Sequence, residues 1–417
     1  MQRRTFLASG ITTSLAAITA PRALAHAQAL THARLSSQPT PRPEASSTLP
    51  ASRLPALARG INLSHWMWYP HAQTESARRA LITASDLTQL ADAGFTHIRL
   101  PFEPDWLWSP ASSSTNTPTT NTPTTSTPPG SLNEPALREY LDAVRACHAS
   151  GLAVIIDAHW SRTPWIRPGE PTHAARMGEL ERMWAALAPR CRDLDPARTL
   201  LEIVNEPHDI TAAAWAESQS LIARTIRAAA PDHTIIATGA SWGSIDGLLE
   251  LAPLDDPNII YSFHFYEPHN FTHQGATWGF PPWKDMKNIP WPAARADLEA
   301  LADTFPAESR NTLRWSARDG TTDPWTPEAL DARIERIHQW SLTHSRPIYC
   351  GEFGAHKPTA PRASRLAWTH ALAESLNTRA IGWAMWDYFG GFALAEGPPG
   401  SRTLDADLVK VLMNPGD

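Results

Sequence analysis

Short apolar runs alternate with longer helical patterns along most of this 417-residue chain. Eight runs have the length and the β-branched interior of strands that are buried on both faces. They are residues 58–63, 97–101, 153–157, 200–205, 234–238, 259–264, 348–352 and 382–386. Helical periodicity covers residues 136–149, 175–187, 212–229, 327–343 and 364–376. This alternation predicts an α/β fold, a (β/α)8 (TIM) barrel in a single domain.

The N-terminus has the composition of a targeting segment. Arg3 and Arg4 form a twin-arginine motif, a mildly apolar stretch follows, and small residues suited to cleavage end at Ala25 or Ala27. We therefore expect residues 1–27 to be a twin-arginine signal peptide and the protein to be periplasmic or secreted. Residues 28–55, rich in Pro and Ser without any period, predict a flexible lead to a domain of residues 56–417.

Charge and hydropathy limit the partners. Loss of residues 1–27 changes the formal charge from −6 to −9, because Arg3, Arg4 and Arg22 are lost and no acid is. Nucleic acid and anionic membranes both favour a positive protein, so we expect neither as a partner. The sequence also lacks an apolar run of about 20 residues, the length that spans a bilayer. We expect a monomer.

Three cysteines are too few for a disulfide framework or a zinc site. Cys147 and Cys191 lie near predicted helices of neighbouring barrel units, so an exported chain could join them. Cys350 lies within the seventh predicted strand, and we expect it to be a buried free thiol.

Two segments interrupt the alternation. Residues 109–131 are almost entirely Ser, Thr, Asn and Pro, which predicts a loop insertion after the second strand, on the face where strand ends emerge. Residues 267–324 form a connection longer than a barrel needs. This connection is rich in aromatic residues, which disfavours disorder and indicates a functional loop.

Two strand-like runs each place a glutamate at or just beyond the C-terminal end. Glu206 follows the run 200–205, and Glu352 ends the run 348–352. Cleavage of a glycosidic bond needs two carboxyl groups, one protonated and one ionised. Side chains at the C-terminal ends of barrel strands converge on one face, so residues far apart in sequence can meet there. The other polar or aromatic residues at such ends are Arg99, His159, Asn205, His264, Tyr266 and Trp386.

Three motifs in this order resemble glycoside hydrolase family 5, the cellulase family. They are Asn-Glu-Pro at 205–207, Tyr-Ser-Phe-His-Phe-Tyr at 261–266 and Gly-Glu-Phe-Gly at 351–354. The resemblance extends from about Leu57 to the C-terminus. It implies an endoglucanase that cleaves β-1,4-linked glucan with retention, without metal or organic cofactor. Glu206 would be the acid/base and Glu352 the nucleophile.

The same resemblance implies roles for the supporting residues. Asn205 would hold the sugar 2-hydroxyl, while Arg99 and Tyr266 would contact Glu352. His159 and His264 would bind sugar or orient Glu206. Because sugar faces stack on aromatic rings, we expect four of the 18 tryptophans to line the cleft: Trp66, Trp160, Trp278 and Trp386. The run 271–278 is similar to an endoglucanase loop, which favours glucan over mannan.

The sequence is also compatible with several other functions. The histidines near strand ends, His65, His159, His208, His264 and His356, also fit a metal-dependent barrel hydrolase, although the ligand spacing is poor. Arg99 outside this constellation, and Asp157, would be interpreted as structural. Mixed-linkage glucan, β-1,3-glucan and mannan are other possible substrates. The same two glutamates also serve a transglycosylase, and a non-catalytic carbohydrate-binding barrel is the alternative from another class.

Overall fold

The computed structural model describes residues 49–50, 53–68, 74–110, 128–160, 173–318 and 325–413. The chain divides into two units, residues 1–46 and 47–417, and the described residues all lie in the second. The predicted signal peptide, most of the predicted lead, and residues 111–127 of the predicted insertion lie outside the described residues.

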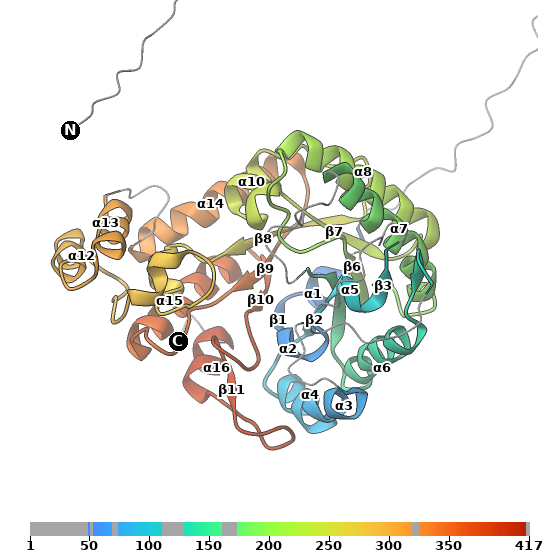
Figure 1. Ribbon diagram of the computed structural model, residues 1–417, viewed down its shortest axis with the longest axis horizontal. Coiled ribbons are helices and arrows are strands. Elements are labelled where there is room, and N and C mark those ends of the chain that lie inside the picture. The colour runs from blue at the N-terminus through green and yellow to red at the C-terminus, as the bar shows by residue number, and fades with distance from the viewer. Residues whose placement is uncertain are drawn as a thin grey trace, which may run out of the picture. The chain divides into compact units, whose positions relative to one another are not determined.

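Eight parallel strands of the described residues close into a barrel, confirming the predicted (β/α)8 fold (Figure 1). The barrel closes where β1 pairs with both β2 and β10. Every predicted strand overlaps an observed one, with ends that differ by up to three residues, because the apolar runs are those buried on both faces. The strands are β1 (Arg59–Asn62), β2 (His97–Phe102), β5 (Ala153–Ala158), β6 (Thr199–Glu202), β7 (Thr234–Thr238), β8 (Ile259–Phe265), β9 (Ile348–Phe353) and β10 (Gly382–Met385).

Helices surround the barrel (Figure 1). The five predicted helices are present, some of them up to six residues longer: α6 (Glu134–Ala149), α7 (His173–Cys191), α8 (Ala212–Ala229), α14 (Pro327–His344) and α15 (Arg362–Thr378). Thr326 caps α14 by accepting a hydrogen bond from the Ala329 amide at 3.3 Å, and Pro327 occupies the first turn. Among the described helices, none has the length and apolar character needed to cross a membrane.

Shorter helices were not predicted, since few of their residues form a long periodic pattern. They are α1 (Arg53–Ala56), α2 (Ser64–Met67), α3 (Glu75–Leu81), α4 (Ala84–Asp92), α5 (Pro104–Leu107), α9 (Ala240–Gly243), α10 (Ile245–Leu249), α11 (His269–Thr272), α12 (Arg295–Ala302), α13 (Ala307–Ser316), α16 (Ala406–Met413) and the 3-10 helix η1 (Pro281–Asp285). A small hairpin, β11 (Ala395–Glu396) with β12 (Thr403–Leu404), precedes α16.

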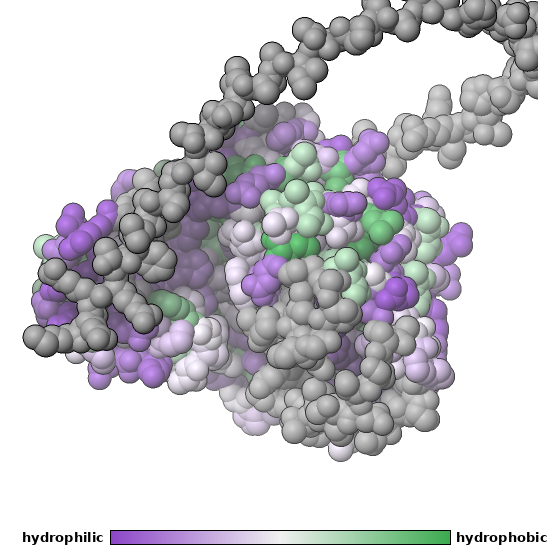
Figure 2. All heavy atoms as spheres, turned by 45° about the horizontal axis from the view of Figure 1, so that its top comes forward, coloured by the Kyte–Doolittle hydropathy of each residue, from purple (hydrophilic) through white to green (hydrophobic). Residues whose placement is uncertain are grey.

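The core has two parts. One set of apolar side chains packs together inside the barrel: Leu57, Ile155, Leu200, Ile236, Ile260, Tyr349 and Ala384. A larger set fills the shell between strands and helices, and it includes the buried Trp184, Trp340 and Trp368. The barrel interior is therefore packed, and a site has room only at its ends. On the face that Figure 2 shows, the coloured surface is mostly hydrophilic, with apolar residues in small, separate patches.

The end of the predicted flexible lead is ordered, which corrects that boundary. Residues 53–55 belong to α1, and the Arg53 side chain is buried. Its Nε donates to Thr234 Oγ1 at 3.0 Å, and its Nη2 donates to the Asp232 carbonyl at 3.3 Å. These bonds tie the segment before β1 to the start of β7.

Both interrupting segments have ordered parts. The residues on either side of 111–127 pair as a two-stranded antiparallel hairpin, β3 (Trp108–Ser109) with β4 (Ser131–Leu132). The long aromatic connection forms α11, η1, α12 and α13, and the last two lie beside the barrel at the left of Figure 1. This connection is therefore ordered, as its aromatic content predicted.

The three cysteines are free and buried. The bridge between Cys147 and Cys191, which the sequence left open, is absent from the structure. Burial raises the pKa of both thiols to about 12. Cys350 is the buried free thiol that its position in a strand predicted.

Candidate active site

Glu206 and Glu352 meet at the C-terminal end of the barrel. Glu352 lies within β9 and is 4% exposed. Glu206 lies four residues beyond β6, and its side chain is 23% exposed. Its φ of 37° lies in the left-handed region, which is rare for a residue other than glycine. Backbone strain of this kind is concentrated at functional sites.

His264, near the end of β8, lies between the two carboxyl groups. Its Nδ1 is hydrogen-bonded to Glu206 Oε1 at 2.7 Å and lies 3.7 Å from Glu352 Oε2. The polar atoms that the three residues present lie within 4.8 Å of one another. Removal from water raises the pKa of Glu206 to about 8 and lowers that of His264. At neutral pH Glu206 is therefore mainly protonated and the imidazole is neutral.

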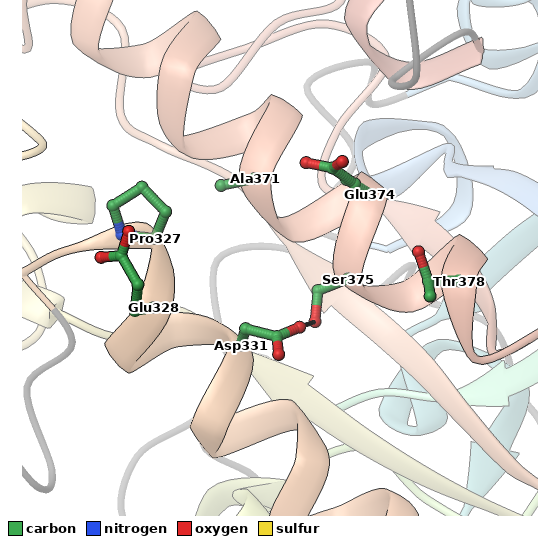
Figure 3. Close-up of a pocket in the computed structure, with 7 residues that line it drawn as sticks. All are labelled: Pro327, Glu328, Asp331, Ala371, Glu374, Ser375 and Thr378. Atoms are coloured by element: carbon green, nitrogen blue, oxygen red, sulfur yellow. Dashed lines mark hydrogen bonds between the residues drawn. The ribbon is translucent and has the colours of Figure 1, made fainter.

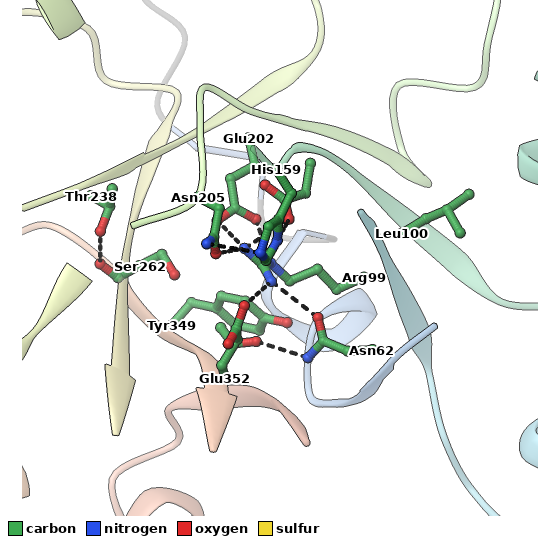
Figure 4. Close-up of polar contacts among 12 residues, drawn as sticks. Asn62, Arg99, Leu100, His159, Glu202, Asn205, Thr238, Ser262, Tyr349 and Glu352 are labelled. Carbon is green, nitrogen blue, oxygen red and sulfur yellow. Dashed lines mark hydrogen bonds and ion pairs between the residues drawn. The ribbon is translucent and has the colours of Figure 1, made fainter. Parts of the chain in front are cut away.

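Arg99, on β2, is fully buried and lies against Glu352 (Figure 4). Each of its five N–H groups has an acceptor. Nε and Nη2 donate to Glu202 at 2.8 and 2.9 Å. Nη2 also donates to Asn205 Oδ1 at 2.9 Å, and Nη1 donates to Asn62 Oδ1 at 3.0 Å and to Glu352 Oε1 at 2.6 Å. The hydrogen-bonding capacity of the guanidinium is thus filled.

Asp157 and His159 extend this network. Asp157 Oδ2 lies 2.9 Å from Arg99 Nη2 and 3.1 Å from His159 Nδ1. Asn205 Nδ2 lies 3.1 Å from His159 Nε2. Burial holds the pKa of His159 well below its ordinary value, so the ring is neutral: Nε2 accepts from Asn205 and Nδ1–H donates to Asp157. Asp157 therefore orients His159, and through it Asn205.

Tyr266 completes the surroundings of Glu352. Its hydroxyl donates to Glu352 Oε2 at 3.0 Å, so both carboxylate oxygens are bonded, one to Tyr266 and one to Arg99. Burial, together with the two glutamates, holds the pKa of Tyr266 well above its ordinary value. The phenol thus stays protonated and remains a donor.

Aromatic rings surround these polar groups. The rings of Trp386 and His159 lie 5.7 Å apart, and Trp68 lies 4.2 Å from His159 and 5.5 Å from Trp386. Trp278 is 51% exposed, and its ring lies 5.3 Å from His273, which in turn lies 5.0 Å from Tyr266. Trp386 thus lies beside His159, and Trp278 is linked through the His273 ring to Tyr266, the hydrogen-bond partner of Glu352.

The expected positions of two tryptophans are wrong. Trp66 is 4% exposed and packs in the core, with Nε1 donating to the Arg78 carbonyl. Trp160 is 7% exposed and is covered by the Arg176 guanidinium, 4.1 Å from the ring centroid. Neither ring faces an open cleft among the described residues. Both residues follow strand ends in the sequence, but their side chains turn inward: Trp66 lies in the short helix α2, and Trp160 lies in the loop after β5.

Sequence reasoning missed four residues of this site: Asn62, Trp68, Glu202 and Asp387. Asn62 ends β1, and Glu202 ends β6 as a lone acid in an apolar run, so their positions did contain a signal. Asp387 follows Trp386 and is 1% exposed, with Oδ2 accepting from Ser64 Oγ at 2.7 Å. Burial raises its pKa to about 8.

A metal ion is the alternative ligand to consider for this site. Among the described residues, the group with suitable donor atoms consists of Glu206, His264 and Glu352. Their donor atoms already bond to protein partners: His264 to Glu206, and Glu352 to Arg99 and Tyr266. A metal would have to displace these bonds. The buried cation Arg99 also opposes a second positive charge beside Glu352.

A separate hollow of about 400 Å³ lies between α14 and α15, on the helical layer (Figure 3). Its acidic residues include Glu328, Asp331 and Glu374. Asp331 is hydrogen-bonded to Ser375 and forms an ion pair with Arg379. The hollow holds none of the groups described above.

A closed (β/α)8 barrel that carries two carboxyl groups at the C-terminal ends of its strands is the architecture of barrel glycoside hydrolases. The model of the cellulase family, glycosyl hydrolase family 5, matches residues 54–389, and the chain belongs to this family.

Named relatives agree with this membership. The chain is 26% identical over 349 residues to Endoglucanase 3 of Fibrobacter succinogenes, covering 82% of this chain but only half of that protein. It is 25% identical to Endoglucanase C of Acetivibrio thermocellus, covering 79% of this chain and 90% of the relative. A structure of Thermotoga maritima Cel5A with cellobiose, in mutant form, matches with a TM-score of 0.66 and 26% identity, covering 88% of this chain and all of the other. Cel5A with mannotriose gives a TM-score of 0.65.

Proposed function

We propose that this protein hydrolyses β-1,4-glucosidic bonds within glucan chains and retains the anomeric configuration. The observation that carries the proposal is the short distance between the two carboxyl groups: one oxygen of Glu206 lies within 4.8 Å of one oxygen of Glu352. Retaining glycosidases place these groups about 5–5.5 Å apart, whereas inverting enzymes need about 6.5–9.5 Å to admit a water molecule.

Each carboxyl group has surroundings that suit one role. Glu352 accepts hydrogen bonds through both carboxylate oxygens, from Arg99 and from Tyr266, and acts as the nucleophile on the anomeric carbon. Glu206, with its pKa raised to about 8, donates its proton to the departing oxygen. In the second step Glu206, now ionised, takes a proton from the water that releases the sugar from Glu352.

Neighbouring groups bind the sugar. Asn205, whose Oδ1 accepts from Arg99 and whose amide also faces Glu206, holds the 2-hydroxyl of the sugar in this proposal. Trp386 and Trp278 offer ring faces for stacking. Glucan is proposed because the relatives are named endoglucanases; the mannotriose complex of Cel5A makes mannan the second candidate.

The test is reducing-end release from carboxymethylcellulose, mixed-linkage glucan, β-1,3-glucan and mannan by wild type, Glu206→Ala and Glu352→Gln. We expect release from the β-1,4-linked glucans and a loss of about 10³-fold or more in both variants, with the fold retained by circular dichroism. A Glu352→Gln variant that keeps most of its rate on an activated aryl cellobioside would refute the assignment. Binding without release in wild type would favour a non-catalytic barrel, and sugar transfer at high acceptor concentration a transglycosylase.

We also propose that the chain is exported through the twin-arginine (Tat) route and acts as a monomer without a metal. Arg3→Lys combined with Arg4→Lys should leave the protein in the cytoplasm in cell fractionation. Activity should survive dialysis against EDTA, because the donor atoms of the site bond to protein groups.

A further inference from the structure

Two acids lie side by side beneath the proposed nucleophile. Asp157 and Glu202 are register partners on the adjacent strands β5 and β6, and both are at most 1% exposed. Two buried carboxylates on paired positions of adjacent strands repel each other unless a cation lies close to both. Arg99 is that cation, and Glu352, on the other side of the guanidinium, is its third carboxylate (Figure 4).

The three acids share Arg99 unequally. Glu202 takes the bidentate edge formed by Nε and Nη2. Glu352 receives one N–H, from Nη1, and its other oxygen is bonded by Tyr266. A bidentate pair is stronger and more directional than a single contact. Glu202 therefore sets the orientation of the guanidinium. It also contributes more than Glu352 to balancing the positive charge of Arg99.

We propose that Glu202 is a positioning residue, which orients Arg99 so that Glu352 accepts only one of its N–H groups and stays a strong nucleophile. The proposal rests on the function proposed above. Without the Glu202 charge, Arg99 would be balanced by Asp157 and Glu352 alone. Glu352 would then be held more tightly, which makes it a weaker base and a weaker nucleophile.

The test compares wild type with Glu202→Gln, Glu202→Asp and the matched control Glu139→Gln. Glu139 forms an equally buried bidentate pair with Arg78, with both bonds at 2.7 Å, and takes no part in the Arg99 network. The substrate is 2,4-dinitrophenyl β-cellobioside, whose leaving group needs no proton from Glu206. The rate of its cleavage therefore reports on Glu352.

We expect Glu202→Gln to lower kcat about 10–100-fold with little change in KM, since small misplacements of reacting groups have effects of this size. The acid limb of its kcat/KM profile should move to lower pH. Glu202→Asp keeps the charge but cannot span both nitrogens, so it should lower kcat less and leave the acid limb in place. Glu139→Gln should lower the melting temperature without moving the limb. If Glu202→Gln does not fold, Glu202→Asp decides the proposal, and an unaltered kcat in that variant overturns it.

A second measurement is independent of turnover. The Glu352 carboxyl is titrated by ¹³C NMR, with its signal assigned by its loss in Glu352→Gln. Other titratable or charged groups also face the Glu352 carboxyl, and the Glu202→Gln substitution alters none of them. They are Arg99, His159, Glu206, His264, Tyr266, Tyr349, Cys350 and Asp387. A lower midpoint in Glu202→Gln supports the proposal; an unchanged midpoint overturns it, even if wild type turned over no β-glycoside.

Discussion

Two glutamates of the same chemistry differ here because their partners differ. Glu352 is almost fully buried and is bonded through both oxygens to donors that stay protonated, Arg99 and Tyr266. Glu206 is more exposed, has a neutral histidine as its partner and has a raised pKa. The raised pKa of Glu206 suits the role of acid that we propose for it.

The raised pKa of Glu206 predicts the alkaline limit of activity. The acid must be protonated in the free enzyme, so kcat/KM on carboxymethylcellulose should fall about tenfold per pH unit above about pH 8. With 2,4-dinitrophenyl β-cellobioside, glycosylation needs no acid, and this limb should be absent from kcat/KM. An identical alkaline limb for both substrates would show that another group is responsible.

An ion pair with a helix of the outer layer anchors the segment that follows strand β8. Glu267 directly follows Tyr266, and its carboxylate is bonded at 2.7 Å by both Nε and Nη2 of Arg333 on α14. Asp246, on α10, accepts from the same guanidinium. A helix of the outer layer thus holds the segment that presents Tyr266 to Glu352.

Capping of α14 gives a prediction that should affect stability and not catalysis. Thr326→Ala removes the acceptor for the Ala329 amide and should lower the free energy of unfolding by about 1 kcal/mol. The matched control is Thr312→Ala in α13, where the hydroxyl donates to the Glu308 carbonyl and caps no amide. Urea unfolding should show a loss for Thr326→Ala and almost none for Thr312→Ala, with kcat unchanged in both. An equal loss in the two variants would contradict a capping role.

Across the molecule, stability comes from a packed barrel and shell without a covalent cross-link among the described residues. Cys147, Cys191 and Cys350 are each 0% exposed. Their pKa values are raised by burial, so little thiolate forms at neutral pH.

Thiol counting tests this arrangement in the purified protein. An aromatic disulfide reagent such as Ellman's should label no cysteine in the native state and all three after unfolding in guanidinium chloride, because every sulfur is buried and reduced. Labelling of one thiol in the unfolded, unreduced protein would reveal a bridge between Cys147 and Cys191. In a protein with that bridge, the melting temperature would also fall on reduction. With three free thiols, we expect reduction to leave the melting temperature unchanged.

The sequence alone determined the eight strands, the five long helices and the positions of Glu206, Glu352 and most residues at strand ends. This is because buried apolar runs and helical periods are local properties, and strand ends of a parallel barrel converge on one face. The folded geometry was needed to show that Trp66 points into the core while Trp68 lies against Trp386. It alone also placed Glu202 and Asp157 on Arg99. Such contacts join residues far apart in the chain, and their geometry depends on barrel register and loop direction, which no local pattern contains.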